Sequence, residues 1–242
     1  MQGNTAGKPV STTGKRSRGR PAQLSRERIL ETTLALLQTV PLAELTMQRL
    51  ARELGITPTA LYGYFSNQQA LFASVSERVL AGIDLSAARR GKNWREVLRA
   101  WTQAVRNQML RYPHSAELVR LQPQMQTPAN WFELMVLPTQ TLRKAGLSDY
   151  LLMDSLRCIS RVVFGSVVNE LTMDPYNLRL EQADASAALD HLAPESRTEI
   201  EYLLPYLGDQ DNDALFSFTV ERLLDGIELL MKQQKKNKKQ NA

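Results

Sequence analysis

The most informative chemical groups of the 242-residue sequence lie in two short segments separated by Gly55. Thr46 and Thr57 begin these segments with hydroxyls that can cap a helix, and Pro58 suits the first helical position, which needs no N–H. Gly55 can adopt the left-handed conformation that ends a helix. Two short helices joined in this way are typical of a helix-turn-helix, whose second helix enters the major groove of DNA. The pattern therefore predicts hydrogen bonding to phosphates and base edges.

The apolar residues of this motif leave the start of its second helix without a core role. One small core can be formed by Leu50, Leu54, Leu61 and Phe65. The residues that remain free to face a major groove are Pro58, Thr59 and Tyr62. Because the first residues of a recognition helix contact base edges and its free N–H groups can hold a phosphate, this helix start is the predicted reading surface.

The elements that must position this surface are predicted to be helices throughout. Ser25 caps a helix that Pro41 ends, and Ser66 opens a third helix with Gln69 completing a capping box. Apolar residues recur at helical spacing through most of the remaining chain, and no sustained alternation indicates a strand. Further helices are predicted at 93–112, 114–121, 129–144, 148–171, 181–191, 195–204 and 213–231. The fold class is therefore all-α, with an N-terminal three-helix helix-turn-helix domain and a larger helical domain.

Basic residues concentrate at the two ends of the chain. The formal net charge is +5, yet residues 1–28 carry seven basic groups against one acid, and residues 232–242 carry five lysines and no acid. The part between them therefore has a net charge of −6. We expect a disordered basic arm at 1–21, a DNA-binding domain at 22–84, a larger domain at 85–231 and a disordered basic tail at 232–242.

The predicted reading surface itself lacks positive charge. Residues 29–75 sum to −1, and the second helix of the motif has no charged residue. Phosphate neutralisation dominates affinity for DNA, so this surface alone would bind weakly. Arg16, Arg18 and Arg20 lie just before the first helix, within reach of an adjacent minor groove, as in other basic arms. The arm is thus predicted to supply the missing charge.

Composition excludes several classes of protein. The first 28 residues contain no apolar stretch typical of a signal peptide, and no run approaches the roughly 18 apolar residues of a transmembrane helix. Cys158 is the only cysteine, and with two histidines it can build neither a disulfide framework nor a Cys/His zinc site. We expect a cytoplasmic protein with no metal, no cofactor and no membrane partner.

Two alternatives to a DNA-binding regulator remain open. One is an α-helical enzyme, although the sequence contains no credible Ser/His/acid triad, phosphate-binding loop or nucleotide fingerprint. The other is an interaction or architectural protein whose basic ends lie on an anionic membrane.

The stretch "LTMQRLARELGITPTALYGYF" followed by "SNQQAL" resembles the DNA-binding domain of the TetR (tetracycline repressor) family. The resemblance covers about residues 22–84. The C-terminal part is similar, more loosely, to the tetracycline repressor's own subclass at "NWREVLRAW", "KAGLSDYLLMDSL", "VVFGSVVNEL" and "FTVERLLDGIELL". The resemblance implies that the chain is a homodimeric transcriptional regulator. It would be a repressor that a small-molecule effector releases from its double-stranded DNA operator.

The resemblance also implies roles for residues of the reading surface. Thr46 and Tyr62 match phosphate contacts, and Pro58 and Thr59 match base-reading positions. Three positions depart from the pattern: Gln48 replaces a base-reading Arg, Tyr64 replaces the usual His, and Gln68 replaces a phosphate-gripping Lys. The predicted DNA contacts are Arg18, Arg20, Thr46, Gln48, Arg49, Thr57, Pro58, Thr59, Tyr62, Tyr64 and Gln68.

A ligand pocket in the larger domain is a further implication. The candidates to line it are Trp101, Val105, Met109, Tyr112, Met125, Trp131, Met135 and Phe164. These apolar, aromatic and methionine residues favour a largely apolar effector, and the alternative is that they are plain core. The metal-binding His of the tetracycline repressor aligns near Tyr112, and no His replaces it, so magnesium–tetracycline is not the expected ligand.

Helix 148–171 carries a stripe of small residues that favours contact with a second helix. Its members are Ser155, Cys158, Val162, Gly165 and Ser166. Gly165 costs about 1 kcal/mol of helix propensity relative to alanine, which a close approach between helices would justify. Together with the final helix, this stripe predicts a four-helix interface between two copies, and an intramolecular contact is the alternative.

Overall fold

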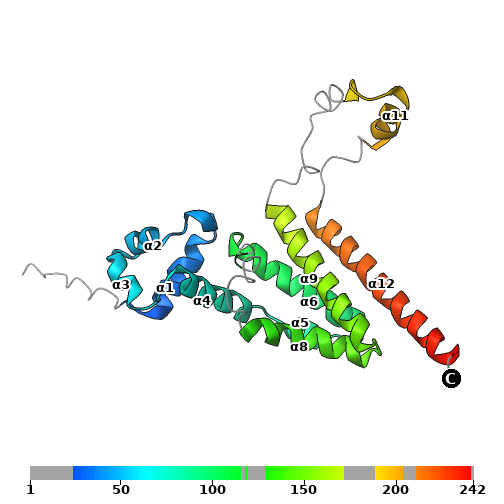
Figure 1. Ribbon diagram of the computed structural model, residues 1–242, viewed down its shortest axis with the longest axis horizontal. Helices are drawn as coiled ribbons and strands as arrows, with labels where there is room; N and C mark the ends of the chain where they lie inside the picture. Colours follow the sequence, from blue (N-terminus) through cyan, green and yellow to red (C-terminus); the bar gives the residue numbers. More distant parts are fainter. Residues whose placement is uncertain (1–23, 116–117, 119–128, 172–188, 204–210, 241–242) are drawn as a thin grey trace, which may run out of the picture.

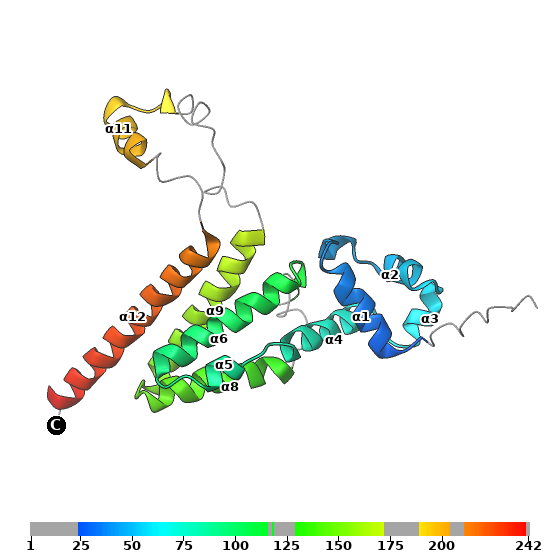
Figure 2. The ribbon, with the colours of Figure 1, turned by 180° about the vertical axis from the view of Figure 1, so that it is seen from behind.

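The structure is a computed structural model that describes residues 24–115, 118, 129–171, 189–203 and 211–240. All the regular elements of these described residues are helical, which confirms the all-α prediction. A small domain built from the first helices lies at one end of the molecule, and α4 (Gln68–Ala81) extends from it into a larger helical bundle (Figures 1 and 2). The predicted arm at 1–21, with Arg18 and Arg20, lies outside the described residues, as does Met125.

The small domain consists of α1 (Arg26–Leu36), the short 3₁₀ helix η1 (Leu42–Glu44), α2 (Met47–Leu54), α3 (Pro58–Tyr62) and α4. The predicted caps form: the Thr46 and Thr57 hydroxyls accept hydrogen bonds from the backbone N–H of Arg49 and Ala60. Gly55 ends α2 with φ 68°, in the left-handed region that favours glycine. The two helices of the motif are therefore held as expected.

The predicted capping box at the start of α4 is wrong. Asn67, rather than Ser66, is the cap, and its Oδ1 accepts from Ala70 N at 2.8 Å. Asparagine caps a helix about as well as serine. With Asn67 as its cap, α4 begins one residue later than predicted. Gln69 is exposed and takes no part in this cap.

The core of the small domain brings together all of its helices. Leu50, Leu61 and Phe65 are buried, as predicted, and they share the core with Ile29 of α1. Leu54 is only partly buried against this core. α3 is thus fixed to the domain by Leu61 on its inner side and by Phe65 just beyond its end.

The larger bundle is built around α6 (Trp94–Arg111), which packs against α5 (Ser86–Arg89), α8 (Ala129–Lys144), α9 (Asp149–Leu171) and α12 (Asn212–Gln240). Its buried centre includes Leu98 and Val105 of α6, Leu142 of α8 and Val163 of α9. α11 (Pro194–Leu203) stands apart from the bundle, beyond the adjacent ends of α9 and α12 (Figure 1). The helices predicted at 114–121 and 181–191 lie largely outside the described residues.

The prediction of a disordered tail from residue 232 is wrong over the described part of that tail. α12 continues to Gln240 through the lysine-rich stretch. Lysine and glutamine are good helix formers, and lysines near a helix C-terminus interact favourably with the helix dipole. Lys232 also pairs with Glu228 one turn earlier, at 2.7 Å.

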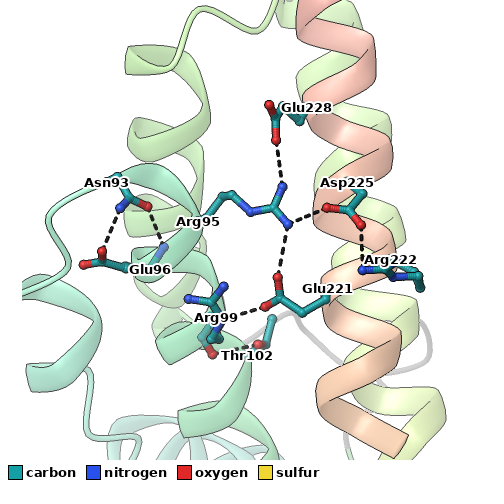
Figure 3. A network of polar contacts seen from close by, with 9 residues as sticks. All are labelled: Asn93, Arg95, Glu96, Arg99, Thr102, Glu221, Arg222, Asp225 and Glu228. Carbon is teal, nitrogen blue, oxygen red and sulfur yellow. Dashed lines mark hydrogen bonds and ion pairs between the residues drawn. The ribbon is translucent and has the colours of Figure 1, made fainter.

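A cluster of ion pairs holds α12 against the start of α6 (Figure 3). Arg95 donates to Asp225 at 2.6 Å, to Glu228 at 2.9 Å and to Glu221 at 3.1 Å. Arg99 donates to the other oxygen of Glu221 at 2.6 Å. We call these five residues the Arg95 cluster. They join parts of the chain more than 120 residues apart, with the three acids following one face of α12.

Candidate nucleic-acid interface

The start of α3 presents the predicted base-reading residues to solvent. Thr57, Pro58 and Thr59 are all exposed, and Tyr62 is 52% exposed although Leu61 beside it is fully buried. The first turn of a helix also has backbone N–H groups without intrahelical partners. The exposed side chains and these donors together form a surface that can contact base edges and phosphates.

The start of α2 forms a second polar surface. A shallow hollow of about 350 Å³ is lined by Glu44, Thr46, Gln48, Arg49 and Arg52. Arg49 donates to Glu44 at 2.7 Å, and Glu44 is itself exposed. The hollow therefore brings together the predicted contacts Thr46, Gln48 and Arg49. It also adds Arg52, which is not among the predicted contacts although its spacing of three residues from Arg49 places it on the same helix face.

Two predicted contacts have their polar atoms bonded inside the domain. Gln68 Nε2 donates to the Leu45 carbonyl at 2.9 Å, which joins the start of α4 to the residue before the cap of α2. Tyr64 Oη donates to the Leu24 carbonyl at 2.8 Å, and the Tyr64 ring is 37% exposed. These contacts position the helices and the entry of the chain, a role that the sequence pattern alone does not indicate.

α4 connects the small domain to the bundle through polar contacts. The Glu77 carboxylate accepts from the backbone N–H of Ala129 at 2.6 Å, at the start of α8. Asn130 Nδ2 donates to the Glu77 carbonyl at 3.1 Å. Gln108 of α6 donates to the Val79 carbonyl at 2.9 Å. A shift of α6 or α8 would therefore act directly on α4, the helix that joins the small domain to the bundle.

The predicted ligand-binding residues gather in the core between α6, α8 and α9. Trp101, Val105 and Met109 are fully buried, and the Trp101 indole N–H donates to the Leu134 carbonyl at 3.1 Å. The partly buried members packed against this core are Tyr112, Trp131, Met135 and Phe164. The rings of Trp131 and Phe164 lie 5.7 Å apart, between centroids. These contacts join Trp101 of α6 to α8, and Trp131 of α8 to Phe164 of α9.

A further hollow lies between α9 and α12, away from these residues. It has a volume of about 200 Å³ and is lined by Ser166, Asn169, Glu170, Asn212, Leu215, Phe216 and Thr219. Glu170 in its wall forms two hydrogen bonds, at 2.7 and 3.0 Å, with Arg106, whose side chain is only 3% exposed. Arg106 also pairs with Asp213 and lies over the Phe216 ring. This ion cluster, centred on the buried Arg106, ties α6, α9 and α12 together.

The outer surfaces of α9 and α12 expose large apolar side chains. Phe218 is 62% exposed and Leu229 is 56% exposed on α12, and Met153 is 52% exposed on α9. The small residues Cys158 and Gly165 are also exposed, and a Cβ added to Gly165 would meet no atom within 4 Å. An intramolecular contact therefore does not account for Gly165 within the described chain.

No helix among the described residues is both long enough and apolar enough to cross a lipid bilayer.

Sequence comparisons match two parts of the chain to known families. Residues 29–75 match the profile of bacterial regulatory proteins of the tetR family, and residues 88–231 match that of the tetracyclin repressor-like C-terminal domain. The class C tetracycline repressor of Escherichia coli is 34% identical over 97 residues, which is 40% of this chain and 44% of that protein. The repressor DrrR1 of Streptomyces coeruleorubidus is 24% identical over 92% of this chain and 84% of its own.

Solved structures share the fold over most of the chain. A possible TetR family regulator from Streptomyces coelicolor is 26% identical, with a TM-score of 0.70 over 85% of this chain and all of that one. BioQ of Mycobacterium smegmatis is 29% identical, with a TM-score of 0.63 over 85% of this chain and 98% of that one. ActR of Streptomyces coelicolor, solved with actinorhodin, is 23% identical with a TM-score of 0.71 over 86% and 98%, a likeness of fold. With both of its parts matched, the chain belongs to the TetR family of bacterial regulatory proteins.

Proposed function

We propose that this chain is a ligand-responsive transcriptional repressor that binds a DNA operator as a homodimer. A small, largely apolar effector in the larger domain releases it. The observation that carries this proposal is the exposed start of α3 beside the polar hollow of α2, in a chain of the TetR family. The DNA-binding part is residues 22–84, and residues 85–231 bind the effector and the second copy.

In this proposal the reading surface divides into base contacts and phosphate contacts. Pro58 and Thr59 face base edges, and the Thr46 and Tyr62 hydroxyls bind phosphates. The exposed Arg49–Glu44 pair is of a kind worth about 0–1 kcal/mol, so a phosphate can replace Glu44 as the partner of Arg49. Arg52 on the same hollow adds a second positive charge.

The homodimer is proposed on the exposed apolar surface of α9 and α12. Phe218, Leu229 and Met153 remain uncovered in a single copy, while Gly165 permits close approach of another helix. Two copies would place two reading surfaces on half-sites about 34–36 Å apart, as dimeric helix-turn-helix proteins do.

The effector site is proposed among the aromatic and methionine residues between α6, α8 and α9. The partly buried Trp131 and Phe164 rings can open toward a ligand at little cost compared with the fully buried Trp101. Trp131 follows Ala129 and Asn130, which hold Glu77 of α4. An effector at this position would therefore move α4 and the reading surface with it. The structure of ActR with actinorhodin and the structure of BioQ with its operator give precedents for the two partners.

We propose no catalytic reaction for this site: the class C tetracycline repressor and DrrR1 are called repressors, and one of the Streptomyces coelicolor structures is called a possible regulator. Because its proposed partner is DNA, we propose that the protein acts in the cytoplasm.

The test is binding to the DNA upstream of the protein's own gene, measured by fluorescence anisotropy at moderate salt. We expect specific retention that unrelated DNA of equal length does not compete away. Tyr62→Ala should weaken this binding about 10-fold or more, because it removes an exposed aromatic phosphate contact. Phe132→Ala is the matched control, since Phe132 is an exposed aromatic residue of α8 far from the reading surface. Equal affinity for all sequences would refute the proposal.

A further inference from the structure

The last turns of α12 carry lysines along one side of the helix. Four of the five lysines in residues 232–242 follow the spacing i, i+3, i+4 and i+7, which brings residues together on one face of an α-helix. At 3.6 residues per turn, the four span about 100° of the helix circumference. All are exposed, and we call them the lysine stripe: Lys232, Lys235, Lys236 and Lys239. The stripe forms because α12 continues as a helix to Gln240.

Gln234 fixes this end of α12 with the stripe turned away from the bundle. Its Oε1 accepts from Ser148 N at 3.1 Å, and its Nε2 donates to the Gly146 carbonyl at 3.3 Å, in the turn between α8 and α9. Around the helix, Gln234 lies about 150° from the middle of the lysine stripe. The contact that holds the helix end therefore leaves the lysines facing solvent.

Most of the positive charge of the stripe has no compensating acid. Lys232 pairs with Glu228 at 2.7 Å, and Glu228 is the last acidic residue of the sequence. Among the described residues, no acid forms an ion pair with Lys235, Lys236 or Lys239. Like charges four residues apart destabilise a helix. A bound polyanion would therefore relieve a repulsion that the chain itself leaves in place.

The lysine stripe lies far from the reading surface. In both views the small domain is at one end of the molecule and the last turns of α12 are at the other (Figures 1 and 2). A duplex bound along the start of α3 would leave the stripe uncovered.

The composition of these turns favours duplex DNA over a lipid surface or a protein as the partner. α12 has no apolar residue between Met231 and its end at Gln240, whereas interfacial helices bury an apolar face and protein interfaces have an apolar core. Lysines are point charges without the planar fork of arginine, which suits phosphate neutralisation independent of sequence. Over about 10 Å of helix, the stripe matches about three phosphates of one DNA strand.

We propose that the lysine stripe is a second DNA-binding surface, which binds duplex phosphates without regard to sequence. Through it, the protein holds another duplex segment while the reading surface occupies the operator. This activity goes beyond the proposed function, which requires one duplex only. The bridging of two segments rests on that function, whereas the affinity of the stripe for DNA does not.

The test is capture of a second duplex by the full chain bound to immobilised DNA from upstream of its own gene. A labelled duplex of unrelated sequence is added at about 50 mM salt, and its retention should fall steeply as the salt approaches about 200 mM. Replacing all four stripe lysines by glutamine keeps helix propensity. This variant should capture about tenfold less labelled duplex, while its affinity for the immobilised DNA changes by less than about twofold.

A second variant keeps the net charge and divides the stripe. It combines Lys232→Gln with Gln233→Lys, and Lys236→Asn with Asn237→Lys, so that two lysines move about 100° around the helix while Gln234 stays in place. Capture should fall about threefold or more, because fewer lysines can meet one strand at once. Circular dichroism and thermal unfolding confirm that both variants keep the helix and the fold.

Three results would overturn the stripe as a DNA-binding surface. They are capture by the glutamine variant equal to that by wild type, capture by the divided stripe equal to that by wild type, and retention on phosphatidylglycerol vesicles without capture of duplex. A wild-type chain that does not discriminate its own upstream DNA would refute the proposed function instead. The stripe is then tested alone, by counting unrelated duplexes bound per chain at low salt in sedimentation velocity. The glutamine variant should bind fewer, and an equal number refutes the stripe.

Discussion

Thr46 and Thr57 each hold a helix start with their hydroxyl and lie exposed on the surface proposed to meet DNA. In the proposed complex, each hydroxyl therefore both caps its helix and contacts DNA. A phosphate approaching Thr46 finds the hydroxyl already oriented by the Arg49 N–H, at 3.1 Å. Such preorganisation reduces the ordering that binding requires.

The two roles of Thr46 can be separated by substitution. Thr46→Ala should lower the free energy of unfolding by about 1 kcal/mol, because the cap of α2 is lost. It should also weaken operator binding. Thr46→Ser keeps the hydroxyl and should restore both, which urea denaturation and anisotropy would measure. If Thr46→Ala loses stability but binds DNA like the wild type, Thr46 is a cap only.

Residues whose partners are close in sequence are the ones that the sequence could predict. The caps at Thr46 and Thr57 and the turn at Gly55 depend on neighbours four residues away or fewer, so residue type and spacing suffice. The Leu24 partner of Tyr64 lies 40 residues away, and no local pattern indicates it. Asn67 shows the limit of local patterns, because two adjacent good caps compete and the choice depends on how α4 packs.

At the scale of elements, α12 is attached to α6 by charge as well as by apolar contact. The hydrogen bond from Arg99, followed by that from Arg95, lowers the pKa of Glu221 from its ordinary value of 4.5, against the opposing effect of burial. A lowered pKa in the folded state means that the unfolded chain binds the proton more readily. The stabilising contribution of Glu221 is therefore present above pH 4.5 and is lost as the pH falls through its lowered pKa.

The pH dependence of thermal unfolding tests the Arg95 cluster. Between pH 6 and about pH 3 the wild-type midpoint should fall more steeply than that of Glu221→Gln, which cannot lose this charge. At pH 6 the variant should be the less stable of the two, because Arg95 and Arg99 lose a shared partner. Glu133→Gln, at an exposed site on α8, is the control and should follow the wild type. Parallel curves for wild type and Glu221→Gln would contradict the role given to Glu221.

The helices themselves follow from periodicity and caps, but their partners do not. Arg95 and Glu221 are 126 residues apart, and nothing in either helix alone indicates that they meet. The lysine-rich end of α12 was predicted to be disordered from its charge, whereas helix propensity and continuity with a packed helix determine its structure. For the same reason the residues around Trp101 could be grouped by type, while their arrangement depends on how three helices pack.

At the scale of the whole molecule, the reading surface and the exposed face of α9 and α12 lie in different domains (Figure 1). Assembly and recognition can therefore be altered separately. The polar contacts of α4 with α6 and α8 are the physical connection between them.

Gly165 allows the proposed homodimer to be tested through one side chain. In a single copy, a Cβ at this exposed helical position meets open space, so Gly165→Ala should raise helix stability by up to about 1 kcal/mol. In a close four-helix interface, Gly165→Leu should push the copies apart and shift the mass in sedimentation equilibrium from dimer to monomer. Glu133→Leu, at an exposed position of α8, serves as a control for added apolar surface. A dimer unchanged by Gly165→Leu would place the interface elsewhere.

The length and continuity of α12 have a practical consequence. Its 29 residues extend over about 44 Å at 1.5 Å per residue, and the Arg95 cluster fastens the middle of the helix to α6. A probe attached beside Gln240 would therefore be held by a rigid helix rather than by a flexible tail. In the proposed homodimer, spin labels at this site on both copies would report a narrow distribution of separations. Pulsed electron resonance could then follow how effector and operator change the spacing between the copies, independently of any DNA-binding assay.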